Sequence, residues 1–353
     1  MDCKISDNVI IDTLNDLKLF TQTNYCKKYL KNNFKDISNE QLELHAEISS
    51  ACFRQSFEYY DTANNSPITT SPLLYSYCLN NMAKGLTYLQ TSDENILKNF
   101  KRHGFNISDS NVKNNLLDTM ITINKIGATK ALLEITNSSI IENIDISFND
   151  LIKRIPFLND IYEKSVSDKS YVMKKTNDYE YILNGTLDEN NEIAMLFKKI
   201  NFQCGYNPYD NISMIWVPMS GQDFIEKNKS NLMYLDYLII PFVVNEDIKP
   251  INQLFITYLV IMGYGMLVRY NAHKWEKFID SKLSEESVLI SMSITVCMNI
   301  FFNIVHSLLF NYIYIEEKYD DEKVKKLLHE NETVDIIQEQ LVKRAREELR
   351  YKL

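Results

Sequence analysis

The chain has 353 residues, of which 45% are apolar and 24% are charged, a balance typical of a folded protein with a substantial core. Its net charge of -9 and pI near 5.2 argue against a protein that coats nucleic acid nonspecifically, because that mode needs many Lys and Arg contacts to phosphate. The net charge is still compatible with a local basic groove on the surface. Only eight Gly and seven Pro occur, so long helices should dominate.

The first elements are expected to be helices. Apolar residues recur at helical spacing from Asp7 to about Phe34. A second helix should begin at Ser38, whose side chain and Gln41 fit a capping box, and should end near the turn at residues 64–67. We interpret this region as a helical lead-in.

A third helix is expected from Leu73 to about Gln90. Ser71 fits its N-cap and Pro72 its first helical position, where no intrahelical donor is needed. Gly85 lies in its interior, and a glycine there costs about 1 kcal/mol relative to alanine unless close packing requires it.

The expected elements then become shorter, and long helices return only near the C-terminal part of the sequence. A short helix from Asp93 should end at Gly104, and helical periodicity continues over residues 112–163. Residues 171–244 contain strand-like runs separated by Asn, Asp and Gly turns, at 179–183, 213–217 and 237–242. Long helices return after Ile251.

One apolar segment, residues 288–315, contains no Asp, Glu, Lys or Arg and is long enough to span a bilayer. Its small polar residues recur every three or four positions and therefore share one helical stripe: Ser291, Thr295, Asn299, Asn303 and His306. Several Asn and a His at mid-depth would be costly in lipid. The pattern therefore favours a buried helix with a polar seam, and no membrane contact is expected.

These elements predict a mainly α protein with a bundle-like core and a small β insert, an α+β arrangement. We divide it into an N-terminal helical region (1–165), a β-containing insert (166–250), C-terminal core helices that pack on the N-terminal region (251–316) and a charged helical tail (317–353). The tail carries a narrow apolar stripe and should dock on the body or on a partner. The stripe consists of Val334, Ile337, Leu341, Ala345 and Leu349.

Several runs of polar and aromatic residues lie on apolar helices. In the first half they are FRQSFEYYDTA at 53–63, SPLLYSY at 71–77, NNMAKGL at 80–86 and His103-Gly104. In the second half they are Ile155-Pro156 ahead of Tyr162, the Pro241 segment, and Leu267–Tyr270 followed by Trp275. Together, over about residues 50–315, they resemble the YaaC-like family of bacterial proteins. That family is largely without an assigned biochemical activity, so the resemblance implies a bacterial, intracellular, mostly helical protein.

The first candidate site is Arg102-His103-Gly104. Charged side chains on apolar helices cost free energy unless they are paired, so such positions mark possible sites. Here His103 can act as a general acid or base beside a cation that holds phosphate. The same residues also fit a helix C-terminus, where basic side chains suit the dipole and Gly takes the left-handed cap, and this alternative is favoured.

Lys84 is a second candidate, on a helix otherwise rich in Leu, Tyr and Met. With Asn81 beside it, it can contact a buried anion or a nucleotide. The favoured alternative is an ion pair with Glu58 or Asp61 on the preceding helix.

The third candidate combines Arg269 and His273, four residues apart and hence on one helical face, with Tyr270 and Trp275 beside them. Helical HEPN-type ribonucleases use an Arg followed by a His after four to six intervening residues, whereas only three intervene here. Aromatic residues beside Arg can also stack on the bases of single-stranded RNA or a nucleotide.

Other chemistry finds no support. The chain has no Gly-rich phosphate loop, no Gly-x-Ser-x-Gly elbow and no His-Glu-x-x-His. Its six cysteines form no Cys-x-x-Cys pair, which predicts neither disulfides nor zinc and fits a reducing cytoplasm. Its first residues do not form a secretory signal. We therefore expect a cytoplasmic protein without a metal or a cofactor.

The leading hypothesis is a binding or regulatory protein whose basic-aromatic pocket holds a nucleotide, RNA or an acidic partner. Packing of residues 39–104 against 252–312 would form this pocket from Lys84, Asn81, Arg102, His103, Arg269, Tyr270 and Trp275. One alternative is a HEPN-like ribonuclease effector in phage defence or a toxin-type conflict, with Arg102, His103, Arg269 and His273 as candidate catalytic residues. Another is a structural homo-oligomer that associates through its tail.

Overall fold

The computed structural model describes residues 2–166, 168–177, 180–184, 192–200, 202–207, 209, 212–280 and 286–316. The predicted tail, residues 317–353, lies outside the described residues. Helices dominate, with strands gathered into small sheets, so the predicted α+β class is confirmed.

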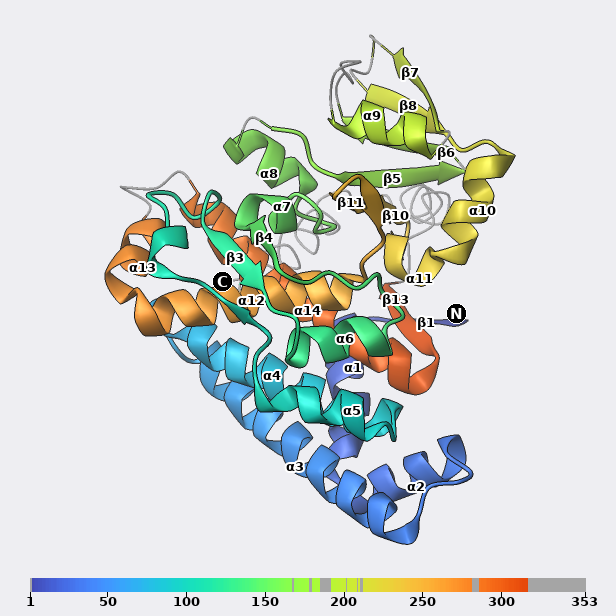
Figure 1. Cartoon of the computed structure of the whole chain (residues 1–353), viewed down its shortest axis with the longest axis vertical. Helices are drawn as coiled ribbons and strands as arrows, with labels where there is room; N and C mark the ends of the chain where they lie inside the picture. Colours follow the sequence, from blue (N-terminus) through green and yellow to red (C-terminus); the bar gives the residue numbers. More distant parts are fainter. Residues whose placement is uncertain are drawn as a thin grey trace, which may run out of the picture.

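Four long helices form the centre of the molecule: α3 (Asn39–Asn64), α4 (Ser71–Gln90), α12 (Gln253–Tyr270) and α14 (Ser287–Phe310). The predicted start of α3 is confirmed, because the Ser38 hydroxyl accepts the backbone N–H of Gln41 at 3.2 Å. Helix α4 begins at Ser71 with Thr70 as its N-cap, one residue earlier than predicted. Helices α3 and α4 lie side by side along one edge of the molecule, and α12 crosses above α4 (Figure 1).

Gly85 explains how closely α3 and α4 approach. A Cβ atom at this position would lie 2.9 Å from the ring of Phe53 and 3.2 Å from Cβ of Cys52 on α3. The hydroxyl of Ser49 on α3 also donates to the carbonyl oxygen of Gly85 at 3.1 Å. Close packing against α3 therefore requires a glycine at this position of α4.

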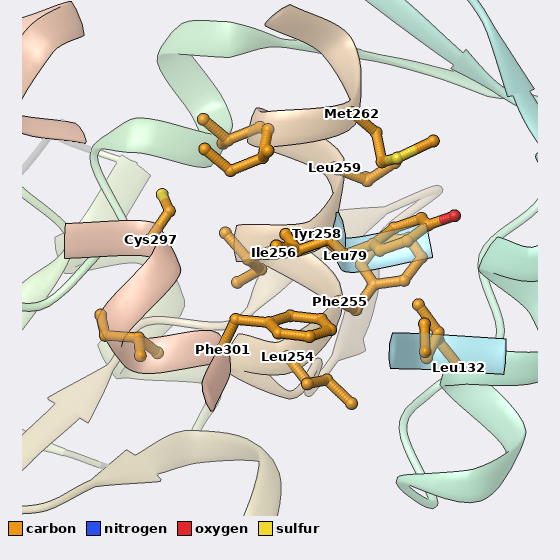
Figure 2. Packing of buried hydrophobic residues seen from close by; sticks show 14 of the residues in the cluster. Leu79, Leu132, Leu254, Phe255, Ile256, Tyr258, Leu259, Met262, Cys297 and Phe301 are labelled. Atoms are coloured by element: carbon orange, nitrogen blue, oxygen red, sulfur yellow. The ribbon is translucent and has the colours of Figure 1, made fainter. Parts of the chain in front are cut away.

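Helix α12 is the centre of the apolar core. Every residue from Gln253 to Gly265 is buried. Figure 2 shows Leu254, Phe255 and Tyr258 between Leu79 of α4 and Phe301 of α14, with Leu132 of α6 beside them. Helix α12 packs on α4, and α14 packs on both of them.

Two helices, α12 and α14, are long and apolar enough to cross a membrane by length and composition alone. In the fold, 83% of the apolar window of α12 and 61% of that of α14 are buried against other parts of the chain. Internal packing therefore accounts for their composition. The predicted polar seam of α14 runs from exposed Ser291 and Thr295 to His306, which is fully buried.

The lead-in is more broken than the sequence predicts. It consists of strand β1 (Asp2–Ser6), helix α1 (Val9–Lys18), a 3-10 turn (Leu19–Thr21) and helix α2 (Thr23–Asn33). The apolar residues keep their helical spacing across the break. Phe20 in the 3-10 turn is fully buried against Phe53 of α3, 5.5 Å between ring centroids.

The expected helical periodicity of residues 112–163 is wrong in part. Strands β2 (Phe105–Asn106), β3 (Met120–Ile123) and β4 (Ile144–Ser147) form an antiparallel sheet here. Between and after them lie α6 (Ala128–Ile135), α7 (Phe148–Ile152) and α8 (Asn159–Val166). In β3 the β-branched residues Ile121 and Ile123 both point inward, as alternate residues of a strand do. A short apolar run of this kind fits a strand or a helix equally well, so its sequence does not distinguish them.

The predicted β region contains a six-stranded antiparallel sheet in the order β7-β8-β6-β5-β10-β9. Its strands are β5 (Val172–Asn177), β6 (Glu180–Asn184), β7 (Gln203–Asn207), β8 (Ile212–Trp216), β9 (Met233–Tyr234) and β10 (Tyr237–Ile239). Helices α9 (Glu192–Lys199), α10 (Met219–Lys227) and α11 (Lys229–Leu232) accompany it. A hairpin of β11 (Phe242–Val244) and β12 (Asp247–Lys249) leads back to α12. The sheet has its own apolar core, which is separate from the helical one.

Arg154 connects this sheet to the helical part. Its guanidinium is almost fully buried and donates to the carbonyl oxygens of Asp150 at 2.7 Å and Ile240 at 3.0 Å. It also lies 4.0 Å from the ring centroid of Phe242. A buried cation is tolerated here because carbonyl oxygens and aromatic faces replace the water it has lost.

The two ends of the described chain meet. Strand β1 pairs in parallel with β13 (Tyr312–Glu316), which follows α14. Below the pair, Asp16 Oδ2 accepts hydrogen bonds from the hydroxyls of Tyr312 at 2.6 Å and Tyr314 at 2.9 Å. His306 places Nε2 3.0 Å from the same oxygen and Nδ1 3.1 Å from the carbonyl oxygen of Tyr312. Both ring nitrogens therefore lie within hydrogen-bonding distance of an oxygen.

Replacing Asp16 should loosen this contact between the chain ends. Burial alone would raise the pKa of Asp16, but the hydrogen bonds from Tyr312, His306 and Tyr314 hold it below its usual 3.8. The carboxylate therefore stabilises the fold above about pH 4, and this contribution is lost as the pH falls through the lowered pKa. We expect Asp16→Asn to lower the free energy of unfolding by about 2 kcal/mol at neutral pH in urea titrations, as for hydrogen bonds to charged groups. Asp12→Asn is the matched control, since Asp12 accepts one hydrogen bond, from Ser6; an equal loss in both would contradict a special role for Asp16.

His45 on α3 should be replaceable with a gain in stability. Its side chain is 1% exposed, and neither ring nitrogen has a hydrogen-bond partner within the described residues. Removing a buried unsatisfied polar group of this kind relieves a desolvation cost, so His45→Leu should raise the free energy of unfolding by about 1 kcal/mol. Ser49→Ala, one turn away, should instead lower it, because the Ser49 hydroxyl is satisfied.

The same variant tests a pH effect. Burial lowers the pKa of His45 below 6.5. The unfolded chain therefore takes up a proton that the folded chain resists, and the stability falls as the pH drops below about 6.5. His45→Leu should remove this part of the pH dependence of stability. An unchanged curve of unfolding free energy against pH would contradict the lowered pKa of His45.

Candidate functional site

The loop that carries His103 is fixed by its backbone. After α5 (Glu94–Leu97) and a 3-10 turn (Lys98–Lys101) the chain becomes extended at Arg102. The carbonyl oxygen of Arg102 accepts the N–H of Ala128 at 2.8 Å, and that of His103 accepts the N–H of Thr129 at 3.2 Å. The loop thus satisfies the first free N–H groups of α6, which has no side-chain cap.

Two glycines make this contact close. Gly104 has φ +86 and Gly127 has φ +133, and a Cβ on either would overlap the other's backbone or the hydroxyl of Thr129. The favoured alternative, in which Gly104 caps the C-terminus of a helix, is therefore wrong. The helical turns end at Lys101, and the positive φ serves the approach to Gly127.

Arg269 lies close enough to His103 for its positive charge to act on the imidazole, although the two residues are 166 positions apart in sequence. Partial burial lowers the pKa of His103 below 6.5, and the positive charge of Arg269 lowers it further. Both side chains keep exposed surface. Neither forms an ion pair with a carboxylate anywhere in the described part of the chain. The imidazole is therefore mainly neutral at pH 7 and lies beside an uncompensated guanidinium.

Tyr270 completes this surface. Its side chain is 63% exposed, and the guanidinium of Arg269 lies 5.1 Å from its ring centroid. Arg102 is also exposed, next to His103 in the chain. We call His103, Arg269, Tyr270 and the adjoining Arg102 the basic-aromatic surface.

The four-residue spacing predicted that His273 and Arg269 share one helical face, and this prediction is wrong. Helix α12 ends at Tyr270, and α13 (Ala272–Ile279) begins after Asn271, whose φ of -134 breaks the helix. The carbonyl oxygen of Asn271 then accepts the N–H groups of Lys274 and Trp275 at 2.9 Å each. The four-residue spacing therefore runs across a turn.

Trp275 lies in the core. The predicted pocket required its ring to face a ligand, and this part of the prediction is wrong. Its side chain is 1% exposed, and its indole N–H donates to the carbonyl oxygen of Ile68 at 3.1 Å. Its ring packs on Tyr264 with 5.3 Å between centroids. The polar atom is satisfied, so this tryptophan serves packing.

Lys84 and Asn81 lie elsewhere on α4. The amide of Asn81 donates to the carbonyl oxygen of Tyr77 within the helix at 3.1 Å. Lys84 faces α3, where its charge counteracts the rise that burial causes in the pKa of Cys52. Its expected ion pair with Glu58 or Asp61 is absent from the described residues. No contact between described residues joins Lys84 to His103 or Arg269.

A second polar region, not predicted from the sequence, surrounds Glu286 at the start of α14. A cavity of about 650 Å³ is lined by this carboxylate together with Asp118, Asn149 and Lys277. Burial raises the pKa of Glu286, and the charge of Asp118 adds to the rise, while N–H groups of Leu116 and Leu117 oppose it. An acidic residue at the start of a helix is ordinary, so no sequence pattern marks this region. The mixed charges specify no single chemistry.

Metal chemistry gains no support from the geometry. Among residues 2–316 as far as they are described, no three His, Cys, Asp or Glu side chains are grouped to hold an ion. The basic-aromatic surface is thus the feature whose chemistry is most specific.

Comparison with known families places the chain. The profile of the family described as YaaC-like Protein matches residues 18–309, most of the chain. The chain belongs to the YaaC-like family. No curated protein and no solved structure matches this YaaC-like protein. The family match includes His103 and Arg269, whereas the paired strands β1 and β13 lie outside the matched residues.

The coupling of His103 to Arg269 in the YaaC-like protein can be measured directly. Arg269→Gln removes a positive charge and should raise the pKa of His103 toward 6.5, as followed by NMR titration of its ring protons. Arg102→Gln is the matched control and should leave that pKa unchanged, because Arg102 does not contribute to the shift. Equal effects of the two variants would show that the general basic field, and not Arg269, is responsible.

Proposed function

We propose that this YaaC-like protein is a binding or regulatory protein whose basic-aromatic surface holds the phosphate and base of a nucleotide or an RNA end. The observation that carries the proposal is that the charge of Arg269 acts on His103 while neither side chain pairs with a carboxylate among the described residues. Such a site favours an anion, because the anion would pair with Arg269 and would offset its repulsion of a protonated His103.

The local charge supports this choice within an acidic protein. Residues 98–103 contain Lys98, Lys101, Arg102 and His103, and Arg269 adds a cation from α12. Arg is suited to phosphate because its planar donors can engage two oxygens at once. The overall charge of -9 disfavours broad coating of nucleic acid, so a short ligand or a strand end fits better than a duplex.

Tyr270 supplies the part of the surface that can contact a base. It is exposed and already lies beside a guanidinium. Aromatic rings next to Arg stack on bases without strong sequence preference. An acidic peptide would use the cations but would gain little from this ring, which favours the nucleotide or RNA.

A ribonuclease of HEPN-like type is the second candidate, favoured by the neutral state of His103 beside Arg269. A neutral imidazole can accept a proton from a ribose hydroxyl while a guanidinium stabilises the phosphate. The two residues come from distant segments and not from one Arg-His motif. RNA cleavage that is lost in His103→Ala, with the fold retained, would favour this candidate over simple binding.

Binding of a 5′-phosphorylated oligouridylate, measured by fluorescence anisotropy at several salt concentrations, tests the proposal. Arg269→Ala should weaken binding and lower the slope of log affinity against log salt by about 0.7, the value per phosphate contact for single strands. Tyr270→Leu should weaken binding by about 1–3 kcal/mol through lost stacking with an unchanged slope.

Lys31→Ala, an exposed cation on α2, is the matched control and should leave affinity and slope unchanged. Mass spectrometry of material that copurifies with the wild type would identify a natural ligand, which Arg102→Ala and Arg269→Ala should lose. Equal binding by wild type and Arg269→Ala would contradict the proposal. Binding of an acidic peptide in preference to the oligouridylate would redirect it to a protein partner.

A further inference from the structure

The parallel pair of β1 and β13 has two faces of different character. On the inner face, Tyr312 and Tyr314 reach Asp16, and Lys4 lies 3.5 Å from the ring centroid of Tyr312. Because side chains alternate along a strand, the residues between them point to the opposite side. The register pairs Cys3 with Ile313 and Ile5 with Ile315 there. We call Cys3, Ile5, Ile313 and Ile315 the outer face.

The outer face is apolar and only partly covered by described residues, since Ile313 and Ile315 are half-buried. Ile5 is 66% exposed, and Cys3 is exposed. Ile313 and Ile315 belong to neither of the two apolar cores nor to the residues packed against them. Parallel strands are normally covered on both faces, and an isolated two-stranded sheet is marginal in water. Such a face therefore gains stability from an apolar occupant.

We propose that the outer face is the docking site of this chain's own C-terminal segment, residues 334–349, through its apolar stripe. Strand β13 ends at Glu316, so the segment is joined to the edge of the face it would cover. The linker of residues 317–333 can extend about 55 Å, far enough to return along the strands. The proposal is independent of the function of the basic-aromatic surface.

Tethering favours the segment of the same chain over a second copy. A tether of this length gives a local concentration on about the millimolar scale, which an untethered copy does not reach in dilute solution. The composition of the segment also fits. Val334, Ile337, Leu341, Ala345 and Leu349 recur at three or four residues, and most of the positions between them are charged or polar and can remain in water.

Cys3 provides a reporter, because it is an exposed thiol on the outer face itself. In the full chain carrying Cys204→Ser, which removes the other exposed cysteine among the described residues, one cysteine is added at a time in the stripe: Ile337→Cys, Leu341→Cys or Ala345→Cys. The matched controls Glu339→Cys and Lys343→Cys lie on the opposite side of a 3.6-residue period. Mild oxidation with diamide is followed by peptide mass spectrometry and non-reducing gels.

The expected result is a disulfide between Cys3 and at least one stripe position within a single chain, formed in preference to both controls. Ile5→Asp, which leaves Cys3 in place, should abolish that preference. A disulfide that joins two chains would overturn the proposal in favour of a second copy. Equal yields at stripe and control positions, or no disulfide with Cys3 at any of them, would also overturn it.

Discussion

The close crossing of α12 over α4 is the contact on which the rest of the molecule depends. A Cβ at Gly265 would overlap the side chain of Ser76 on α4, and one at Gly263 would lie 2.6 Å from the ring of Phe148 at the start of α7. The hydroxyl of Tyr258 donates to the amide oxygen of Asn80 at 3.0 Å. Two glycines inside a helix each cost about 1 kcal/mol in propensity, so their presence reflects the packing they permit. This crossing fixes the end of α12, where Arg269 lies one turn beyond Gly265.

Much of the helical framework can be predicted because its signals are local. Ser38 with Gln41 defined the start of α3. Strands β6, β8 and β10 were found from β-branched and aromatic runs between turn residues. Strands β3 and β4 were missed, since four-residue apolar runs fit either period. The break at Asn271 was missed because no Gly or Pro marks it.

The candidate site was predicted less well, for a different reason. His103 and Arg269 were both identified, but nothing in either segment specifies that the two come together. The His103 loop is held by the contact of Gly104 with Gly127, which joins separate segments of the chain and depends on backbone approach. Trp275 and Lys84 were assigned to the same pocket because residues 39–104 were expected to pack against 252–312. Burial of the indole and the facing of Lys84 toward α3 are properties of tertiary packing, which no local pattern contains.

The pairing of β1 with β13 has a consequence for the order in which this protein folds. Residues about 310 positions apart are joined there, so the pair closes almost the whole described chain into one loop. The entropy cost of closing that loop becomes small only after the intervening helices have folded and brought the two strands closer together. The helical core must therefore assemble first, and the two ends join it last. On the reverse path the same strands separate before the core does, which makes the chain ends the earliest region of the native protein to exchange with water.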